Sequence, residues 1–227
     1  DKEAARKTMI EHGFPVVPGS EGTVDTLKEA VSSAKSIGYP LMIKAAKGGG
    51  GKGIRIVEDA CALEREFPLV RREAELAFGD GSVYLEAYLP QARHIEVQIL
   101  ADMHGNVLHL GTRECTLQRK NQKLIEEAPA ANIPEATRAA IEQTAVDIAR
   151  AVGYQNAGTV EFLLTRDGRF FFMEMNARIQ VEHPITESIF GLDLIKAQIQ
   201  VAMGHHIRIS QENLIPRGHA IECRINA

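Results

Sequence analysis

Hydrophobic and polar positions in roughly the first 90 residues switch between helical and strand-like spacing. Apolar residues three to four positions apart predict helices over residues 2–12, 23–37 and 59–78. Short apolar or alternating segments predict strands over residues 40–45, 54–57 and 83–86. This part of the chain therefore predicts a small lobe of short strands and helices.

Beyond residue 88 the pattern changes to longer strand-like segments. Alternation predicts strands over residues 94–100, 107–110, 159–164, 170–176 and 222–227. Helices are predicted over residues 134–152 and 192–203, and a loop over residues 178–184. We expect a mixed α+β fold, in which a small lobe folds over a larger, mostly antiparallel one. The expected division is a first helix and linker at residues 1–16, a small lobe at 17–88 and a large lobe at 89–227.

The segment KGGGGKGI at residues 47–54 contains the G-x-G-x-x-G spacing of dinucleotide-binding proteins. A strand pattern follows it where that fingerprint needs a helix, and Gly53 stands where a P-loop needs a Ser or Thr hydroxyl. What remains is a hairpin whose glycines let backbone N–H groups close over polyphosphate. The lysines that add positive charge to it are Lys44, Lys47 and Lys52. A surface hairpin with a flexible tip is the alternative.

The composition bounds the function further. With 44% hydrophobic and 25% charged residues, the 227-residue chain is typical of a globular protein. Its net charge of −4 argues against a general nucleic-acid or membrane surface. No apolar run approaches the roughly 20 residues that span a bilayer. The three cysteines lack metal-ligand spacing and fit a reducing compartment, so we expect a cytoplasmic protein, or one of the mitochondrial matrix or plastid if the source is eukaryotic.

Two acidic residues stand on a predicted hairpin. Asp167-Gly168 between two strand-like runs is a strong signal for a two-residue turn. Counting outward places Glu161 opposite Glu174, with Cβ atoms about 5 Å apart. Facing carboxylates repel each other, and a divalent cation is the natural compensation, with Asn176 and then Arg178 on the same face. A solvated outer face that is charged by chance is the alternative.

Short motifs follow one another along the whole chain at residues 1–2, 44–45, 48–53, 86–89, 93–98, 118–123, 126–129, 157–162, 174–184 and 222–227. In type and order they resemble the motifs of the ATP-grasp enzymes and, within these, of the biotin carboxylases. The resemblance implies an ATP-grasp fold with a small lid lobe over a larger one. It also implies ATP- and Mg²⁺-dependent carboxylation of biotin with bicarbonate, through carboxyphosphate.

The resemblance assigns an ATP site to this sequence. Lys2 and Lys44 would contact the phosphates, covered by the glycine loop with Gly49, Gly50 and Gly51. Glu86 and the backbone near Leu89 would form the hinge that binds adenine. The residues implied to pack on the base or to lie near the ribose and phosphates are Leu163, His94 and Gln118.

The resemblance also implies a metal and a bicarbonate site. Glu161, Glu174 and Asn176 would hold Mg²⁺, or Mn²⁺ in its place. The bicarbonate pocket would comprise Lys123, Arg178, Gln180 and Val181. Glu182 would be the general base that takes the bicarbonate proton during attack on the γ-phosphorus, and Arg224 would steady the biotin enolate.

The implied partners are a biotin carboxyl carrier protein or domain and a carboxyltransferase component, with a homo-oligomer expected for the full-length form. Asn121 departs from the acetyl-CoA carboxylase branch, which usually places His there. Both ends of the chain look cut, so we expect a fragment that lacks the N-terminal lobe and the C-terminal segment of the family. The competing hypotheses are another ATP-grasp ligase, such as a carbamoyl-phosphate-forming synthetase, and a nucleotide-binding module without turnover.

Overall fold

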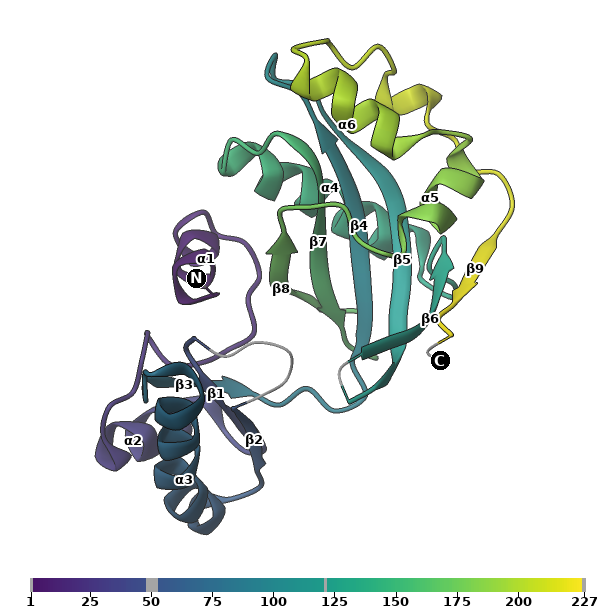
Figure 1. Cartoon of the computed structure of the whole chain (residues 1–227). Helices are drawn as coiled ribbons and strands as arrows, with labels where there is room; N and C mark the ends of the chain where they lie inside the picture. Colours follow the sequence, from purple (N-terminus) through teal and green to yellow (C-terminus); the bar gives the residue numbers. More distant parts are fainter. Residues whose placement is uncertain (1, 48–52, 121, 226–227) are drawn as a thin grey trace. The chain divides into compact units, whose positions relative to one another are not determined.

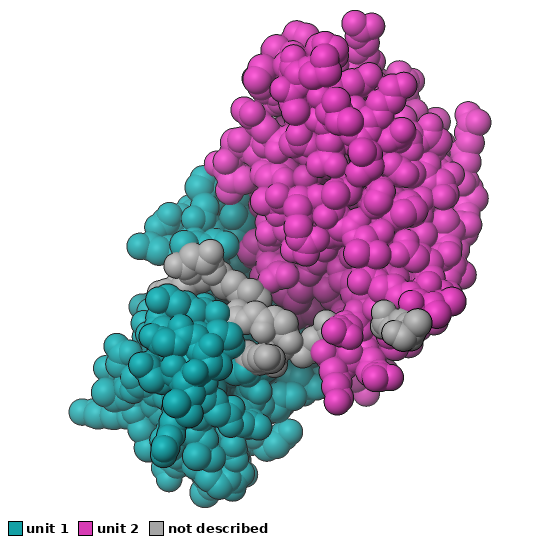
Figure 2. All heavy atoms as spheres, viewed as in Figure 1, with its two compact units in different colours: residues 1–90 teal, residues 91–227 magenta. Residues whose placement is uncertain are grey.

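The computed structural model describes residues 2–47, 53–120 and 122–225, and the side chains of Lys2 and Glu3 are not described. The chain divides into two compact units, residues 1–90 and 91–227 (Figure 2). Each unit contains its own β-sheet (Figure 1). Among the described residues, none of the helices combines the length and the apolarity that crossing a bilayer requires.

The small unit is built on a three-stranded sheet in the order β2-β1-β3. Its strands are β1 (Leu41–Ala45), β2 (Ile54–Val57) and β3 (Val83–Ala87), and its helices are α1 (Lys2–Glu11), α2 (Leu27–Ile37) and α3 (Ala60–Phe78). The hairpin prediction is confirmed for its strands, because β1 and β2 pair antiparallel with Lys44 opposite Ile54. The glycine tip at residues 48–52 lies outside the described residues.

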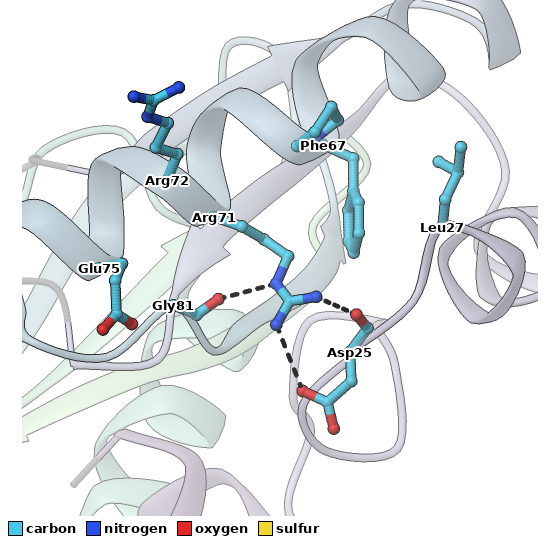
Figure 3. Close-up of a pocket in the computed structure, with 8 residues that line it drawn as sticks. Asp25, Leu27, Phe67, Arg71, Arg72, Glu75 and Gly81 are labelled. Atoms are coloured by element: carbon cyan, nitrogen blue, oxygen red, sulfur yellow. Dashed lines mark hydrogen bonds and ion pairs between the residues drawn. The ribbon is translucent and has the colours of Figure 1, made fainter.

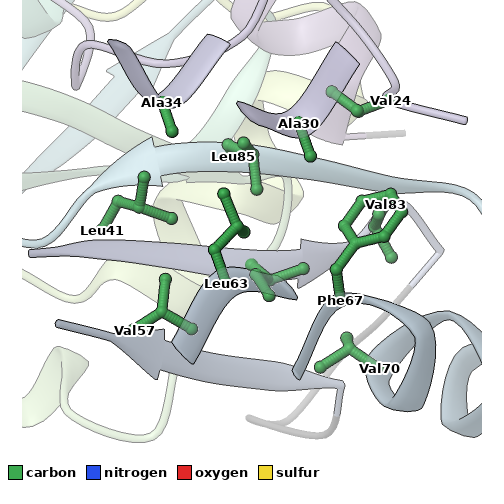
Figure 4. Close-up of a cluster of buried hydrophobic side chains, with 11 residues drawn as sticks. Val24, Ala30, Ala34, Leu41, Val57, Leu63, Phe67, Val70, Val83 and Leu85 are labelled. Carbon is green, nitrogen blue, oxygen red and sulfur yellow. The ribbon is translucent and has the colours of Figure 1, made fainter. Parts of the chain in front are cut away.

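The core of the small unit is wholly apolar and lies between the sheet and the helices α2 and α3 (Figure 4). Leu41, Leu63 and Leu85 are fully buried there. Helix α2 begins later than predicted, because Thr26 has an extended backbone and caps the helix with Glu29 in a capping box. The residues 59–78 form one helix, α3, with Pro68 inside it.

The large unit contains a six-stranded sheet in the order β8-β7-β4-β5-β6-β9. Its strands are β4 (Arg93–Ala101), β5 (Val107–Arg119), β6 (Gln122–Ala128), β7 (Asn156–Leu164), β8 (Phe170–Asn176) and β9 (Ala220–Cys223). Its helices are α4 (Glu135–Ala151), α5 (His183–Phe190), α6 (Leu194–Ala202) and the short 3₁₀ helix η1 (Gln211–Asn213). Figure 1 shows α4 on one face of this sheet and α5 with α6 on the other. Every pair of neighbouring strands in this sheet is antiparallel, which confirms the expected antiparallel character of the large lobe.

Three predictions for the large unit were incomplete or wrong. Strand β5 continues to Arg119, nine residues past the predicted end, and β6 was not predicted. Helix α5 begins at His183, inside the predicted loop. Pro184 argued for a loop, but it lies in the first turn of α5, where a missing backbone N–H costs nothing because that group has no partner in the helix.

The predicted pairing of Glu161 with Glu174 on β7 and β8 is confirmed, although the predicted turn is wrong. Thr165 N donates to Arg169 O, so three residues form the turn, and Gly168 takes a φ of 82° in it. A bulge between Glu161 and Phe162 then shifts the register by one residue. The longer turn and the bulge each shift the register by one residue, and the two shifts cancel at Glu161. Glu161 therefore pairs with Glu174 as predicted.

Candidate active site

The candidate site begins on strand β4, which is buried on both faces. Ile95, Val97 and Ile99 are fully buried, and so are Glu96 and Gln98 between them. Because successive side chains of a strand point to opposite faces, one face of β4 is apolar and the other carries charge into the interior. A buried carboxylate requires partners, so this face of the sheet must bring cations to Glu96.

Lys123 on β6 supplies one of these cations. Its Nζ lies 2.6 Å from Glu96 Oε2, 3.1 Å from Glu161 Oε1 and 2.6 Å from Glu182 Oε1. The three N–H bonds of the ammonium group thus have three carboxylate acceptors. Burial alone would lower the pKa of Lys123, but the attraction of the carboxylates, chiefly Glu96, outweighs burial and raises the pKa. Lys123 therefore stays charged at physiological pH.

Glu161 on β7 accepts hydrogen bonds from several other side chains. Its Oε1 accepts from Asn176 Nδ2 at 3.0 Å and from Gln180 Nε2 at 2.9 Å. Its Oε2 lies 3.0 Å from His94 Nε2. Gln118 Nε2 donates to His94 Nδ1 over 2.9 Å, so a neutral His94 carries its proton on Nε2. Burial alone would raise the pKa of Glu161, but the contacts with His94, the neighbouring ammonium group and Gln180 lower it.

Asn176 and Arg178 lie beside Glu161 at the end of β8. Arg178 is exposed, and it donates from Nη2 to Asn176 Oδ1 at 3.5 Å and from Nη1 to Ile179 O at 3.2 Å. Neither acceptor is charged, so the positive charge of Arg178 is available to an anion from solvent. Glu174 is partly buried on the same strand and pairs with Glu161 across the hairpin.

Glu182 immediately precedes helix α5 and is only 2% exposed. Its Oε1 accepts from Lys123, and its Oε2 accepts from Arg224 Nη2 at 2.9 Å. Arg224 also donates from Nε to Glu126 Oε1 at 2.6 Å. Burial raises the pKa of Glu126, and Arg224 offsets part of that rise. Both oxygens of Glu182 are thus held by cations that come from different segments of the chain.

Arg113 on β5 completes the cluster from within the core. Its Nε donates to Glu96 Oε1 at 2.5 Å. Burial alone would raise the pKa of Glu96, but Arg113 and Lys123 outweigh burial and lower the pKa. In this cluster four carboxylates, those of Glu96, Glu126, Glu161 and Glu182, meet three cations, Arg113, Lys123 and Arg224. The excess negative charge favours a further cation.

A divalent cation fits the donor chemistry of this region. The ligand atoms of His94, Glu96 and Glu161 lie within 4.8 Å of one another. This group shares Glu161 with the predicted metal ligands, while Glu174 and Asn176 stand next to it on β8. Carboxylate and amide oxygens are the ligands that Mg²⁺ and Mn²⁺ prefer. In this structure Asn176 directs its Nδ2 to Glu161 and its Oδ1 to Arg178.

The remaining predicted residues of the large unit lie on or beside this network. Leu163 pairs with His94 across β7 and β4. Gln180 is buried, whereas Val181 is 59% exposed. The structure thus joins through contacts the predicted residues His94, Gln118, Lys123, Glu161, Asn176, Arg178, Gln180, Glu182 and Arg224.

The small unit brings two other predicted residues together. Lys44 on β1 forms an ion pair with Glu86 on β3, and Arg6 Nε lies 3.8 Å from Glu86 Oε1. Leu89 follows β3 and is partly buried. The backbone of Lys2 lies in α1, whereas Gly49, Gly50, Gly51 and the departing position Asn121 lie outside the described residues.

A pocket of about 480 Å³ in the small unit involves none of the predicted site residues (Figure 3). It is lined by Asp25, Leu27, Phe67, Pro68, Arg71, Arg72, Glu75 and Gly81. Two hydrogen bonds fix the side chain of Arg71 within it. Its Nε donates to Gly81 O at 3.1 Å, and its Nη1 donates to Asp25 O. The pocket is a groove between α3 and the start of α2, and all of its lining residues belong to the small unit.

Sequence reasoning gave no role to Glu96, Arg113 or Glu126. The polar alternation of residues 94, 96 and 98 was a usable signal for Glu96, because it marks one face of β4 as polar. Arg113 lay past the predicted end of its strand, and Glu126 lay on the strand that was not predicted. Neither could be assigned to a face of the sheet.

Residues 1–210 match the family model described as the carbamoyl-phosphate synthase L chain, ATP binding domain. The chain is 52% identical over its full length to a biotin carboxylase of Nostoc sp., of which it covers 51%. A solved biotin carboxylase–beta-gamma-ATP complex from Campylobacter jejuni is 48% identical with a TM-score of 0.94, over 99% of this chain and 50% of that one.

A second solved structure is the biotin carboxylase domain of the Hydrogenobacter thermophilus 2-oxoglutarate carboxylase, in complex with MgADP, ADP and bicarbonate. It is 47% identical with a TM-score of 0.94, over 100% of this chain and 50% of that one. The chain therefore spans about half the length of the relatives that it matches.

Proposed function

The chain belongs to the family of carbamoyl-phosphate synthase L chain ATP-binding domains and has an ATP-grasp fold, and we propose that it carries the ATP and bicarbonate chemistry of a biotin carboxylase. The proposed reaction uses ATP and bicarbonate to form carboxyphosphate and then carboxylates biotin. The observation that carries this proposal is the position of Glu182, which is buried with one oxygen on Lys123 and the other on Arg224.

This arrangement suits activation of a small anion. Bicarbonate is a weak nucleophile, and it attacks the γ-phosphorus of ATP more readily if a base removes its proton during the attack. Glu182 is the proposed base, because its position is fixed on both sides. Arg178 and Lys123 would orient the anion by their positive charges, with Gln180 and Val181 lining the same pocket.

Glu161, Glu174 and Asn176 are the proposed ligands of Mg²⁺ or Mn²⁺. The facing carboxylates of β7 and β8 and the excess negative charge of the cluster support this assignment. When bound, the ion would neutralise charge on the transferring phosphoryl group.

The ATP-binding role of the other residues is also a proposal. Lys44, Lys2 and the glycine loop with Gly49, Gly50 and Gly51 would contact the phosphates. Glu86 and the backbone at Leu89 would bind adenine, with Leu163 packing on the base. His94 and Gln118 would lie near the ribose and the phosphates. The ion pair of Lys44 with Glu86 places a cation and an acceptor side by side on the sheet of the small unit.

The proposed partners follow from the acceptor. Biotin would be presented by a carrier protein or domain and steadied as its enolate by Arg224, and a carboxyltransferase component would use the product. The full-length protein is proposed to form a homo-oligomer in the cytoplasm or in the matrix or plastid of a eukaryotic cell. The relatives in biotin-dependent systems support this set of partners.

Glu182→Gln in the natural protein that carries this chain tests the proposal. The change keeps the shape of the side chain but removes its basicity, so ATP binding should stay within about twofold while bicarbonate-dependent phosphate release falls at least a hundredfold, on the order expected for a lost general base. Glu127→Gln is the matched control on strand β6, because Glu127 pairs with His219 and not with Lys123 or Arg224, the partners of Glu182. Survival of both ATP binding and bicarbonate-dependent release in Glu182→Gln would refute the assigned base.

The description of the matching family supports a second candidate, a synthetase that forms carbamoyl phosphate. Such an enzyme would share the phosphate chemistry and the bicarbonate pocket, but ammonia in place of biotin would react with carboxyphosphate. Stimulation of phosphate release by biotin or by ammonia distinguishes the two candidates.

A further inference from the structure

Arg113 is the largest of the fully buried side chains among the described residues. Its guanidinium group has five N–H bonds, and the structure provides five acceptors for them. The acceptors are Glu96 Oε1 at 2.5 Å, Gln98 Oε1 at 2.8 Å, Thr186 Oγ1 at 2.9 Å, Thr159 Oγ1 at 3.2 Å and Gln180 Oε1 at 3.4 Å. An arginine with all its donors directed to side chains, and with no exposure to water, is a costly feature that needs an explanation.

The five acceptors come from four different segments around β5. Glu96 and Gln98 belong to β4, and Thr159 belongs to β7. Gln180 lies in the segment between β8 and α5, and Thr186 lies in α5 itself. One side chain therefore ties the polar segment before α5, which carries the proposed bicarbonate pocket, to the centre of the large sheet.

We propose that Arg113 is the positioning residue of the bicarbonate pocket, which it aligns through Glu96 and Gln180 without touching the anion. The inference rests on the proposed function for the identity of that anion. Arg113 holds one oxygen of Glu96, and the other oxygen holds Lys123. On its other side it holds the side-chain oxygen of Gln180.

The contact with Gln180 fixes which way that amide faces. Arg113 has only N–H donors, so the Gln180 atom that faces it must be the amide oxygen, which accepts the hydrogen bond. Glu161 presents only oxygen lone pairs, so it requires the nitrogen, and Gln180 Nε2 does donate to Glu161 Oε1 at 2.9 Å. Arg113 and Glu161 thus favour the same orientation of the Gln180 amide. Loss of Arg113 removes one of the two hydrogen bonds that fix this orientation.

Lysine cannot replace arginine in this role. Its ammonium group has three donors at one point, whereas the planar fork of Arg113 spreads its donors over acceptors on β4, β7 and α5. Arg113→Lys keeps the buried positive charge beside Glu96 but leaves some of Gln98, Thr159, Gln180 and Thr186 without a donor. The substitution therefore separates the positioning effect from the charge.

The experiment measures steady-state kinetics of the natural protein that carries this chain, for wild type and Arg113→Lys. We expect the KM for bicarbonate to rise between about tenfold and a hundredfold, the size expected when reacting groups are misplaced by about 1 Å, while the KM for ATP stays unchanged. Arg93→Lys is the matched control, because Arg93 also pairs with a glutamate of the same sheet, Glu114, and donates to Asn132 O at 3.2 Å. It should change neither KM.

A purely structural role predicts a different result. Arg113→Lys would then lower the melting temperature while both KM values stay at the wild-type level, and this outcome would overturn the proposal. If Arg113→Lys does not fold, Thr186→Val provides the second test, because it removes one acceptor of Arg113 and keeps the side-chain shape. A KM for bicarbonate that rises severalfold in Thr186→Val supports the proposal, and an unchanged KM overturns it.

A readout outside turnover distinguishes failure of this inference from failure of the proposed function. In the wild type, the side-chain amide protons of Gln180 should exchange slowly with solvent, because the amide is buried and bonded on both sides. Their NMR signal should exchange rapidly or disappear in Arg113→Lys and persist in Arg93→Lys. An unchanged Gln180 signal in Arg113→Lys would contradict the positioning role, whatever reaction the protein catalyses.

Discussion

The two units of the chain differ in how many charged residues they bury. The core cluster of the small unit consists of apolar side chains, and its ion pair of Lys44 with Glu86 lies on the sheet outside that cluster. The large unit buries Glu96, Arg113 and Glu182 almost completely within its sheet and the segment before α5. The core cluster of the small unit is therefore stabilised by hydrophobic burial, whereas the interior of the large unit must also pair its charges in order to fold.

Because, among the described residues, only the large unit buries an ionic network, we expect folding stability and catalysis to depend on the same residues there but not in the small unit. In the small unit, the residues that form the core are distinct from those proposed to bind ATP. In the large unit, Lys123 and Glu182 belong both to the proposed active site and to the buried ionic network. Substitutions in the large-unit network should thus change folding and turnover together, and substitutions in the small-unit core should change folding alone.

The largest effect is expected for Glu96→Ala in the large unit. It removes an acceptor from the buried Arg113 and from Lys123, and an unpaired buried charge costs about 4 kcal/mol of unfolding free energy. Bicarbonate-dependent phosphate release should fall in parallel, because Lys123 loses a partner that holds it. Chemical denaturation and a phosphate assay measure the two effects, and a stable variant with normal turnover would show that the buried network supports neither folding nor chemistry.

Leu63→Ala should have the next largest effect, in the small unit. Leu63 is fully buried in the apolar core, and its truncation leaves a cavity that costs about 3 kcal/mol. Hydrogen exchange should accelerate at the amides of α3 and β1, and the KM for bicarbonate should not change. A changed KM for bicarbonate would show that the core of the small unit affects catalysis as well as folding.

A smaller effect, of opposite sign, is expected for Glu142→Gln on α4. Burial raises the pKa of Glu142 from 4.5 to about 7, with Arg138 offsetting part of the rise. Its Oε2 lies 3.9 Å from Nδ1 of His109, whose pKa burial lowers. A carboxyl group whose pKa is raised on folding destabilises the protein above the folded pKa and has no such effect below the unfolded pKa. Glu142→Gln should therefore stabilise the large unit by roughly 2 kcal/mol at pH 8 and by almost nothing at pH 4.

Melting temperatures of wild type and Glu142→Gln between pH 4 and pH 8 check this prediction. Asp147→Asn on the same helix is the control, because the side chain of Asp147 is 45% exposed. A constant difference between wild type and Glu142→Gln across this pH range would contradict the burial effect. The result measures the free energy of unfolding that a buried carboxylate costs when, like Glu142, it lies outside the ionic network.

The smallest effect is expected for Thr26→Ala at the start of α2. Thr26 Oγ1 accepts from Glu29 N at 3.2 Å, and loss of such a cap costs about 1 kcal/mol. Circular dichroism during thermal unfolding measures the change. Thr26→Ser should restore wild-type stability, because serine provides an equivalent cap, and a Thr26→Ser variant as unstable as Thr26→Ala would argue against the capping explanation.

Most of the fold could be predicted from the sequence, because the helices and strands there follow hydrophobic periodicity. The antiparallel strands at residues 54–57 and 94–100 and the helix at 134–152 show clear alternation or helical spacing. The pattern failed where charged and polar residues replace apolar ones. The second half of β5 contains Arg113, Glu114 and polar residues after them, so its strand period is hidden by charge.

The candidate site was predictable only in part. The pairing of Glu161 with Glu174 was derived correctly, but only because a bulge cancelled the error in the turn. The ionic contacts of Glu182 depend on Arg224 and Lys123, which are separated from it by 42 and 59 positions in the sequence. Periodicity does not encode such distant contacts. The resemblance to a known family identified Lys123, Glu182 and Arg224. The role of Arg113, which donates to five side chains, could be inferred only from the structure.

The most direct test of the account is phosphate release from ATP by the natural protein, measured with bicarbonate and Mg²⁺ in the presence of either free biotin or ammonia. The account predicts that release requires bicarbonate, rises when biotin is added and does not respond to ammonia. Release that ammonia stimulates and biotin leaves unchanged would contradict it.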